Sequence, residues 1–173
     1  MRYARVLGGA VLGAAVGCIS TNEALLRSAV AGAGLPREIE GFCACQVRLK
    51  KAMPAMFRYV RATPPAAFWV LRFERSPGEQ QPSAFTDLNS LLTTLKQDKQ
   101  EFAVAEKASF LADRTLPVKA AYYRFQEDGL WQEGCFCVWE DPGGGRVFAL
   151  NCVADEKPPP ALIERLLKAC GAE

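Results

Sequence analysis

The chain has 173 residues, 50% of them hydrophobic and 23% charged, so its length suits one ordinary domain with a proper core. Lys and Arg number 21 against 19 Asp and Glu, and the resulting formal charge of +2 gives no electrostatic case for nucleic-acid binding. Histidine is absent, which excludes Ser-His-Asp and Cys-His catalysis and histidine-ligated zinc.

The first twenty residues have the pattern of a targeting segment. Arg2 and Arg5 precede the uncharged run 6–20, VLGGAVLGAAVGCIS, which is short for crossing a bilayer at about 1.5 Å per residue. Within it, Ala15 to Cys18 (AVGC) resembles a bacterial lipobox. The resemblance implies removal of a signal peptide, residues 1–17, and diacylation of Cys18. Loss of the two arginines would leave equal numbers of basic and acidic side chains.

An uncleaved membrane helix is the alternative for this segment. Gly9, Gly13 and Gly17 recur every four residues, a spacing that lets two helices approach closely in a membrane. Under the first interpretation the protein is lipid-anchored at the periplasmic or outer-membrane face. Under the second it is an accessory subunit of a larger membrane complex, bacterial or organellar.

Residues 20–34 are expected to form a short helix. Ser20 to Glu23 fits an S-x-x-E capping box, and Gly34 and Pro36 end the helical pattern. Residues 18–40 then serve either as a tether to the membrane or as an N-terminal helix lying on the core. Residues 41–173 are expected to form one α+β domain.

Extended segments follow. Residues 42–50 alternate, with Cys43, Cys45, Val47 and Leu49 predicted on an apolar face, and further strands are expected over 56–62 and 67–75. A helix begins at Ser83, with one apolar stripe made of Phe85, Leu88, Leu91, Leu92 and Leu95. Strands are predicted over 101–112, 118–126, 130–140 and 146–154, of which the last three form a meander, and a helix over 161–170 closes the chain.

This order predicts an α+β fold, with an antiparallel sheet in two parts covered by helices. It resembles the PsbP-like fold in the segments FWVLRFER, FTDLNSLLTTL, KAAYYRFQEDGLWQEGCFCVWE and RVFALNCVA, over residues 42–170. The resemblance implies a PsbP-like sandwich and a binding or assembly role without catalysis. It transfers no functional residue to this chain.

The seven cysteines are the unusual feature of the composition. If Cys18 carries lipid, the disulfide candidates in an oxidising compartment are Cys43, Cys45, Cys135, Cys137, Cys152 and Cys170. A bridge between Cys135 and Cys152 requires a register that places them opposite each other. Free buried thiols are the alternative, and two C-x-C pairs that converged would suit Zn²⁺ or Cu⁺ in a thiol-based metal carrier. We assign no metal site and no cofactor.

Two further clusters have a functional and a structural interpretation. The basic residues Arg48, Lys50, Lys51, Arg58 and Arg61 form either a patch for an anionic partner or the solvated face of alternating strands. Trp131 and Trp139 share strand parity with the second C-x-C pair and are expected in the core. No catalytic motif is present, so the sequence predicts a non-enzymatic, lipid-anchored protein that binds a protein or another envelope component.

Overall fold

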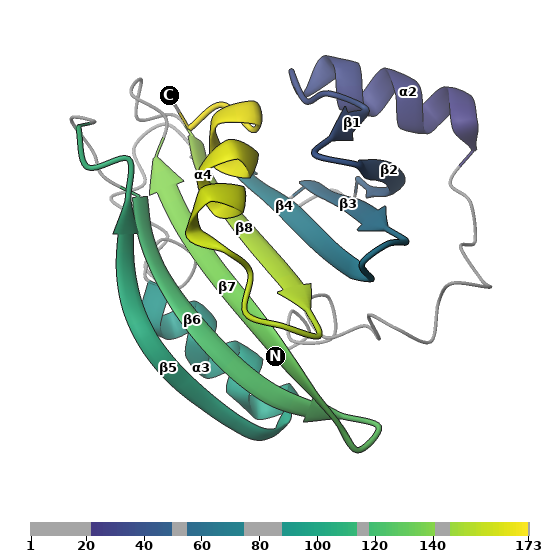
Figure 1. The fold of residues 1–173 in the computed structure, drawn as a ribbon. Helices are drawn as coiled ribbons and strands as arrows, with labels where there is room; N and C mark the ends of the chain where they lie inside the picture. The colour runs from purple at the N-terminus through teal and green to yellow at the C-terminus, as the bar shows by residue number, and fades with distance from the viewer. Residues whose placement is uncertain (1–21, 50–54, 75–87, 114–117, 141–145, 173) are drawn as a thin grey trace.

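One antiparallel sheet of eight strands forms the centre of the protein (Figure 1). The computed structural model describes residues 22–49, 55–74, 88–113, 118–140 and 146–172. Within them the strand order is β1-β2-β3-β4-β8-β7-β6-β5. The strands are β1 (Glu38–Ile39), β2 (Phe42–Arg48), β3 (Ala55–Arg61), β4 (Ala66–Glu74), β5 (Gln100–Phe110), β6 (Val118–Glu127), β7 (Leu130–Glu140) and β8 (Arg146–Ala154). The helices are α2 (Glu23–Gly32), α3 (Leu88–Asp98) and α4 (Pro160–Ala169).

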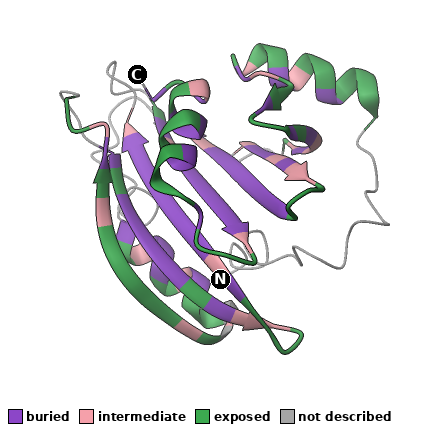
Figure 2. Ribbon diagram, viewed as in Figure 1, coloured by how far each residue is buried: buried purple, intermediate pink, exposed green. Residues whose placement is uncertain are grey.

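The expected fold class is wrong. Strands take up 53% of the described residues and helices 25%, so the fold is β-rich and not an α+β sandwich covered by helices. Seven strand spacings of about 4.8 Å make the sheet roughly 34 Å wide, whereas a ten-residue helix is only about 15 Å long. The edge strand β5 is accordingly mostly exposed (Figure 2). None of the described helices is long and apolar enough to cross a membrane.

The expected division of the sheet into two parts is also wrong. Strand β4 pairs with β8 along its whole length, from Ala66 opposite Ala154 to Glu74 opposite Arg146. This pairing joins the N-terminal strands to the β6-β7-β8 meander in one continuous sheet. Because the two partners are far apart in the sequence, no local pattern indicates it.

Each face of the sheet carries its own core. On one face α2 and α4 pack over a cluster that includes Phe68, Tyr122 and Trp139. On the other face α3 packs its buried leucines, Leu88, Leu91, Leu92 and Leu95, against the opposite sides of the same strands. The predicted stripe of this helix is therefore confirmed for its described residues, while Ser83 and Phe85 lie outside them. Burial on both faces explains why β6, β7 and β8 are apolar with little alternation.

The apolar face predicted for residues 42–50 is correct at Val47, which is buried, and wrong at Cys43 and Leu49, which are exposed. A register shift between Ala44 and Gln46 inserts an irregularity into β2, so the buried residues are Phe42, Ala44 and Val47. Cys43 is exposed and Leu49 is 55% exposed instead of buried. A bulge changes which residues share a face, and the period-two pattern does not show where one occurs.

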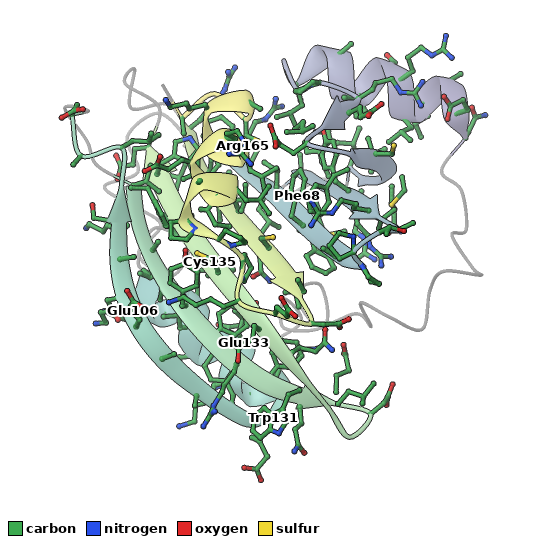
Figure 3. All side chains as sticks on the ribbon, in the orientation of Figure 1. Phe68, Glu106, Trp131, Glu133, Cys135 and Arg165 are labelled. Carbon is green, nitrogen blue, oxygen red and sulfur yellow. The ribbon has the colours of Figure 1, made fainter. Side chains whose placement is uncertain are left out.

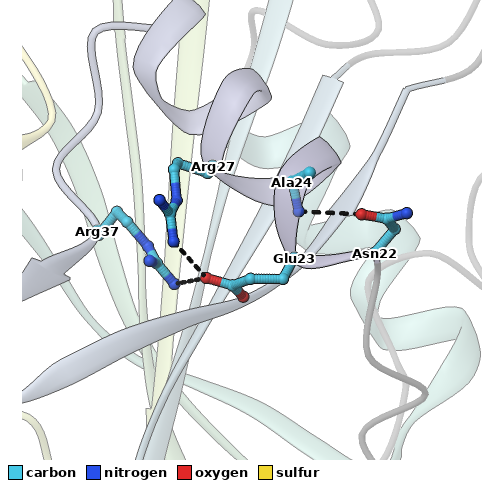
Figure 4. A network of polar contacts seen from close by, with 5 residues as sticks. All are labelled: Asn22, Glu23, Ala24, Arg27 and Arg37. Atoms are coloured by element: carbon cyan, nitrogen blue, oxygen red, sulfur yellow. Dashed lines mark hydrogen bonds and ion pairs between the residues drawn. The ribbon is translucent and has the colours of Figure 1, made fainter.

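Helix α2 packs against the core and is not a detached tether. Leu26 and Val30 are buried beneath it, and Asn22 caps its N-terminus by accepting a hydrogen bond from the Ala24 N–H at 3.0 Å. The described helix thus begins at Glu23, three residues after the expected start. Glu23 also accepts Arg37 at 2.7 Å and lies 3.7 Å from Arg27 (Figure 4), which ties the helix to the segment leading into β1.

Candidate functional site

A pocket of about 460 Å³ opens where β4 begins and β8 ends, beside the first turns of α4. Its apolar floor is made of Ala66, Cys152, Ala154 and Leu162. The segment 155–159 after β8 forms one wall, the Pro64–Pro65 turn another, and Glu40 and Arg61 complete the rim. Three stretches of the chain, at Glu40, 61–66 and 152–165, therefore converge on one cavity.

Three of the six charged residues that line the pocket, Glu40, Lys157 and Arg165, form ion pairs. Arg165, which extends from α4 (Figure 3), donates from Nε to Glu40 at 2.8 Å and so links α4 to the β1–β2 turn. Lys157 lies 2.7 Å from Glu106 on β5 and 4.3 Å above the ring of Tyr122, so it holds the segment 155–159 against the sheet. These contacts fix the shape of the walls.

Asp155 accepts a hydrogen bond from a buried side chain of the sheet. The Nε2 atom of buried Gln132 donates to Asp155 Oδ1 at 3.3 Å and to the Trp131 carbonyl at 3.1 Å. The neighbouring Glu156 also lines the pocket and is exposed. Two carboxylates are thus presented from one short segment.

Among the positively charged side chains that line the pocket, Arg61 is the one whose charge is least neutralised by carboxylates. Its Nε donates to the Pro64 carbonyl at 3.3 Å, and its guanidinium lies 4.5 Å from the ring centroid of Phe42. No ion pair of Arg61 occurs among the described residues, in contrast to Arg165 and Lys157. A ring and a carbonyl therefore orient this guanidinium while its remaining N–H groups stay available for an anion.

The N-terminus of α4 forms part of the same wall. The helix begins with Pro160, its N-cap is Pro159, and no side chain caps it. Pro160 has no N–H, and Leu162 N–H is bonded to the Pro159 carbonyl at 2.9 Å, which leaves the N–H of Ala161 without an intrahelical acceptor. The positive end of the helix dipole adds to the charge of Arg61.

The thiol beneath the pocket is a poor nucleophile. Burial raises the pKa of Cys152 to about 12, with a further rise from Cys135 and an opposing effect of the Arg61 charge. Only the thiolate reacts, so the raised pKa keeps this thiol in its unreactive form at neutral pH.

The buried thiols form a trio on one face of the sheet. Cys135 lies directly opposite Cys152 in the β7–β8 register, and the Sγ atoms of Cys135 and Cys137 are 3.7 Å apart. All six described cysteines are free thiols, and Cys170 is buried at the end of α4. The register that a Cys135–Cys152 bridge requires is therefore present, while disulfide formation stays a prediction.

The two C-x-C pairs do not converge. Three strands, β3, β4 and β8, separate Cys43 and Cys45 on β2 from Cys135 and Cys137 on β7. No cluster of potential metal ligands occurs among the described residues. A four-sulfur site is thus not formed, and we do not propose a metal carrier.

The predicted basic patch is not one surface. Arg58 and Arg61 point to opposite sides of β3, because they are three positions apart on a strand whose successive side chains alternate between faces. Arg58 lies 5.6 Å from the ring of Trp69 in the α3-side core, whereas Arg61 lies against Phe42. Arg48 is half-buried, and Lys50 and Lys51 lie outside the described residues.

The two tryptophans have different environments. Trp139 is buried as predicted, but Trp131 is 45% exposed because it sits beyond the core at the β6–β7 hairpin (Figure 3). Arg124 lies 5.1 Å from its ring. The two side chains lie on the same face of β7, as their shared strand parity predicts. The sheet extends past its helices at Trp131, so that residue is not in the core.

Sequence reasoning missed most of the pocket. It singled out Arg61 and Cys152 but not Glu40, Asp155, Glu156, Lys157 or Arg165. The one available signal was the segment DEKPPP, residues 155–160, where three charged residues precede three prolines that stiffen the chain. The Glu40–Arg165 contact spans most of the chain and has no local signature.

Comparisons with known proteins leave the family open. No protein-family model matches the chain, and no curated protein matches it significantly. Among solved structures, the crystal structure of "Protein of Unknown Function PA94" from Pseudomonas aeruginosa is similar with a TM-score of 0.42 and 11% identity. That match covers 69% of this chain and 85% of the other, and we draw no functional conclusion from it.

Proposed function

We propose that the protein is a lipid-anchored, non-catalytic binding protein of the cell envelope, attached through Cys18. The pocket beside α4 is the observation that carries the binding role. Its charged walls are fixed by the Glu40–Arg165 and Lys157–Glu106 pairs, which suits recognition of a ligand by a largely preformed site.

The chemistry of the pocket supports binding over catalysis. A general base or nucleophile works best with a pKa near neutrality, and burial instead moves the pKa of Cys152 upward to about 12. Asp155 is engaged by Gln132, and Arg165 by Glu40. These engaged groups fix the walls, and Arg61 and Glu156, which have no ion pair among the described residues, remain to contact a charged partner.

The lipid anchor is supported by the sequence AVGC, residues 15–18. Helix α2 begins only a few residues after Cys18 and packs on the core through Leu26 and Val30. An acyl chain on Cys18 would therefore hold the domain, and with it the pocket, close to the bilayer surface.

Metabolic labelling with a radioactive fatty acid tests the anchor. We expect label in the wild-type protein and none in Cys18→Ser. Cys43→Ser is the matched control, because Cys43 is an exposed thiol that no lipobox precedes, and it should keep the label. Equal labelling of Cys18→Ser and wild type, or no label in either, would contradict the proposal.

A further inference from the structure

The pocket is lined by charges of both signs. Arg61 and the N-terminus of α4 supply positive potential, while Asp155 and Glu156 supply two carboxylates. A purely anionic ligand would meet the carboxylates, and a purely cationic one would meet Arg61. The walls therefore favour a small ligand that carries both signs.

The guanidinium of Arg61 suits a carboxylate in particular. A guanidinium offers parallel N–H donors that match the two oxygens of a carboxylate, and Arg61 is held in place by Phe42 and the Pro64 carbonyl. Since the Nε of Arg61 is already used, its terminal nitrogens remain for the ligand. The N–H of Ala161, in the first turn of α4 that also lines the pocket, is a further donor.

The carboxylates of Asp155 and Glu156 suit an ammonium group. Glu156 carries no ion pair among the described residues, and Asp155 uses only Oδ1 toward Gln132. An ammonium group has three donors, so two neighbouring carboxylates satisfy it better than one.

We propose that the pocket binds a small zwitterion with a free carboxylate and a free ammonium group, such as an amino acid or a short peptide, with Arg61 on the carboxylate. This inference deepens the proposed function by naming a ligand class. A cavity of about 460 Å³ exceeds the needs of a single small amino acid, so we expect short peptides to bind more tightly than free alanine.

Calorimetric titration of the full-length protein in detergent tests the ligand class, with trialanine, its C-terminal amide, its N-acetyl form and free alanine as probes. We expect trialanine to bind best, the amide at least tenfold more weakly, and the N-acetyl form several-fold more weakly. Equal binding of trialanine and its amide would overturn the proposal, as would no binding of any probe at millimolar concentration.

Two variants test the role of Arg61. Arg61→Gln should weaken trialanine binding at least tenfold while leaving the affinity for the amide almost unchanged. Arg58→Gln is the matched control, because Arg58 lies on the same strand and also stacks on an aromatic ring, but on the other face of the sheet. It should bind trialanine within twofold of wild type.

Thermal unfolding of both variants shows whether each is folded at the titration temperature. Wild-type affinity in folded Arg61→Gln would overturn the proposal. The fatty-acid labelling of Cys18 is independent of these titrations, so failure of the ligand class and failure of the lipid anchor are distinguishable.

Discussion

Gly134→Ala is expected to be among the most damaging single-methyl changes in the protein. Gly134 lies opposite Tyr123 in the β6–β7 register, and the tyrosine ring covers the space that a side chain would occupy. A Cβ at this position would overlap the Cζ of Tyr123 and lie 2.6 Å from its Oη. The ring has no room to move, because Tyr123 is 1% exposed and packs within the α3-side core.

The cost has two parts. Overpacking a core typically costs about 1–3 kcal/mol, and displacing the Tyr123 hydroxyl from Asn151, which it reaches at 2.5 Å, costs about another 1–2 kcal/mol. We therefore expect Gly134→Ala to lower the free energy of unfolding by about 3 kcal/mol, or Tm by roughly 6–12 °C for a chain of this size.

Urea denaturation followed by tryptophan fluorescence measures this effect. Gly32→Ala is the control: nothing lies within 4 Å of its added Cβ, and alanine is the better helix former, so stability should stay equal or rise by up to about 1 kcal/mol. The reasoning is refuted if Gly134→Ala costs less than about 1 kcal/mol.

Three further outcomes follow from the same cores. Tyr123→Phe leaves the buried Asn151 Oδ1 without its donor and should cost about 1–2 kcal/mol in urea denaturation; no loss would show that the bond contributes nothing. Iodoacetamide at pH 8 should modify exposed Cys43 quickly and buried Cys137 and Cys152 only after unfolding, as read by mass spectrometry; fast labelling of the buried pair would contradict their burial. Burial raises the pKa of Cys152 and of Cys170 from 9.0 to about 12, so above pH 9 the unfolded chain loses these protons first. Stability should therefore fall as the pH rises from 9 to 12, and Cys170→Ala should show a shallower slope.

The elements themselves were largely predictable from the sequence. Expected strands such as 130–140 and 146–154 coincide with β7 and β8, because apolar runs bounded by turn residues mark them locally. The buried leucines of α3 were equally visible through their helical spacing. Which side chains of β2 face the core was not predictable from the sequence, because the bulge after Ala44 changes the side on which later residues lie.

The arrangement of these elements was not predictable from local patterns. The β4–β8 pairing that makes one sheet joins residues such as Ala66 and Ala154, and no periodicity within either strand selects that partner. The pocket depends on this pairing, because its floor lies where the two strands meet. Arg61 appeared in the sequence only as one of several basic residues, and its stacking on Phe42 is a tertiary contact.

Intact-mass analysis of the protein extracted from native membranes tests the central claim most directly. The account predicts a chain that begins at Cys18, lacks residues 1–17 and carries the added mass of acyl groups on that cysteine. A chain that begins at Met1, with no acyl group on Cys18, would contradict it.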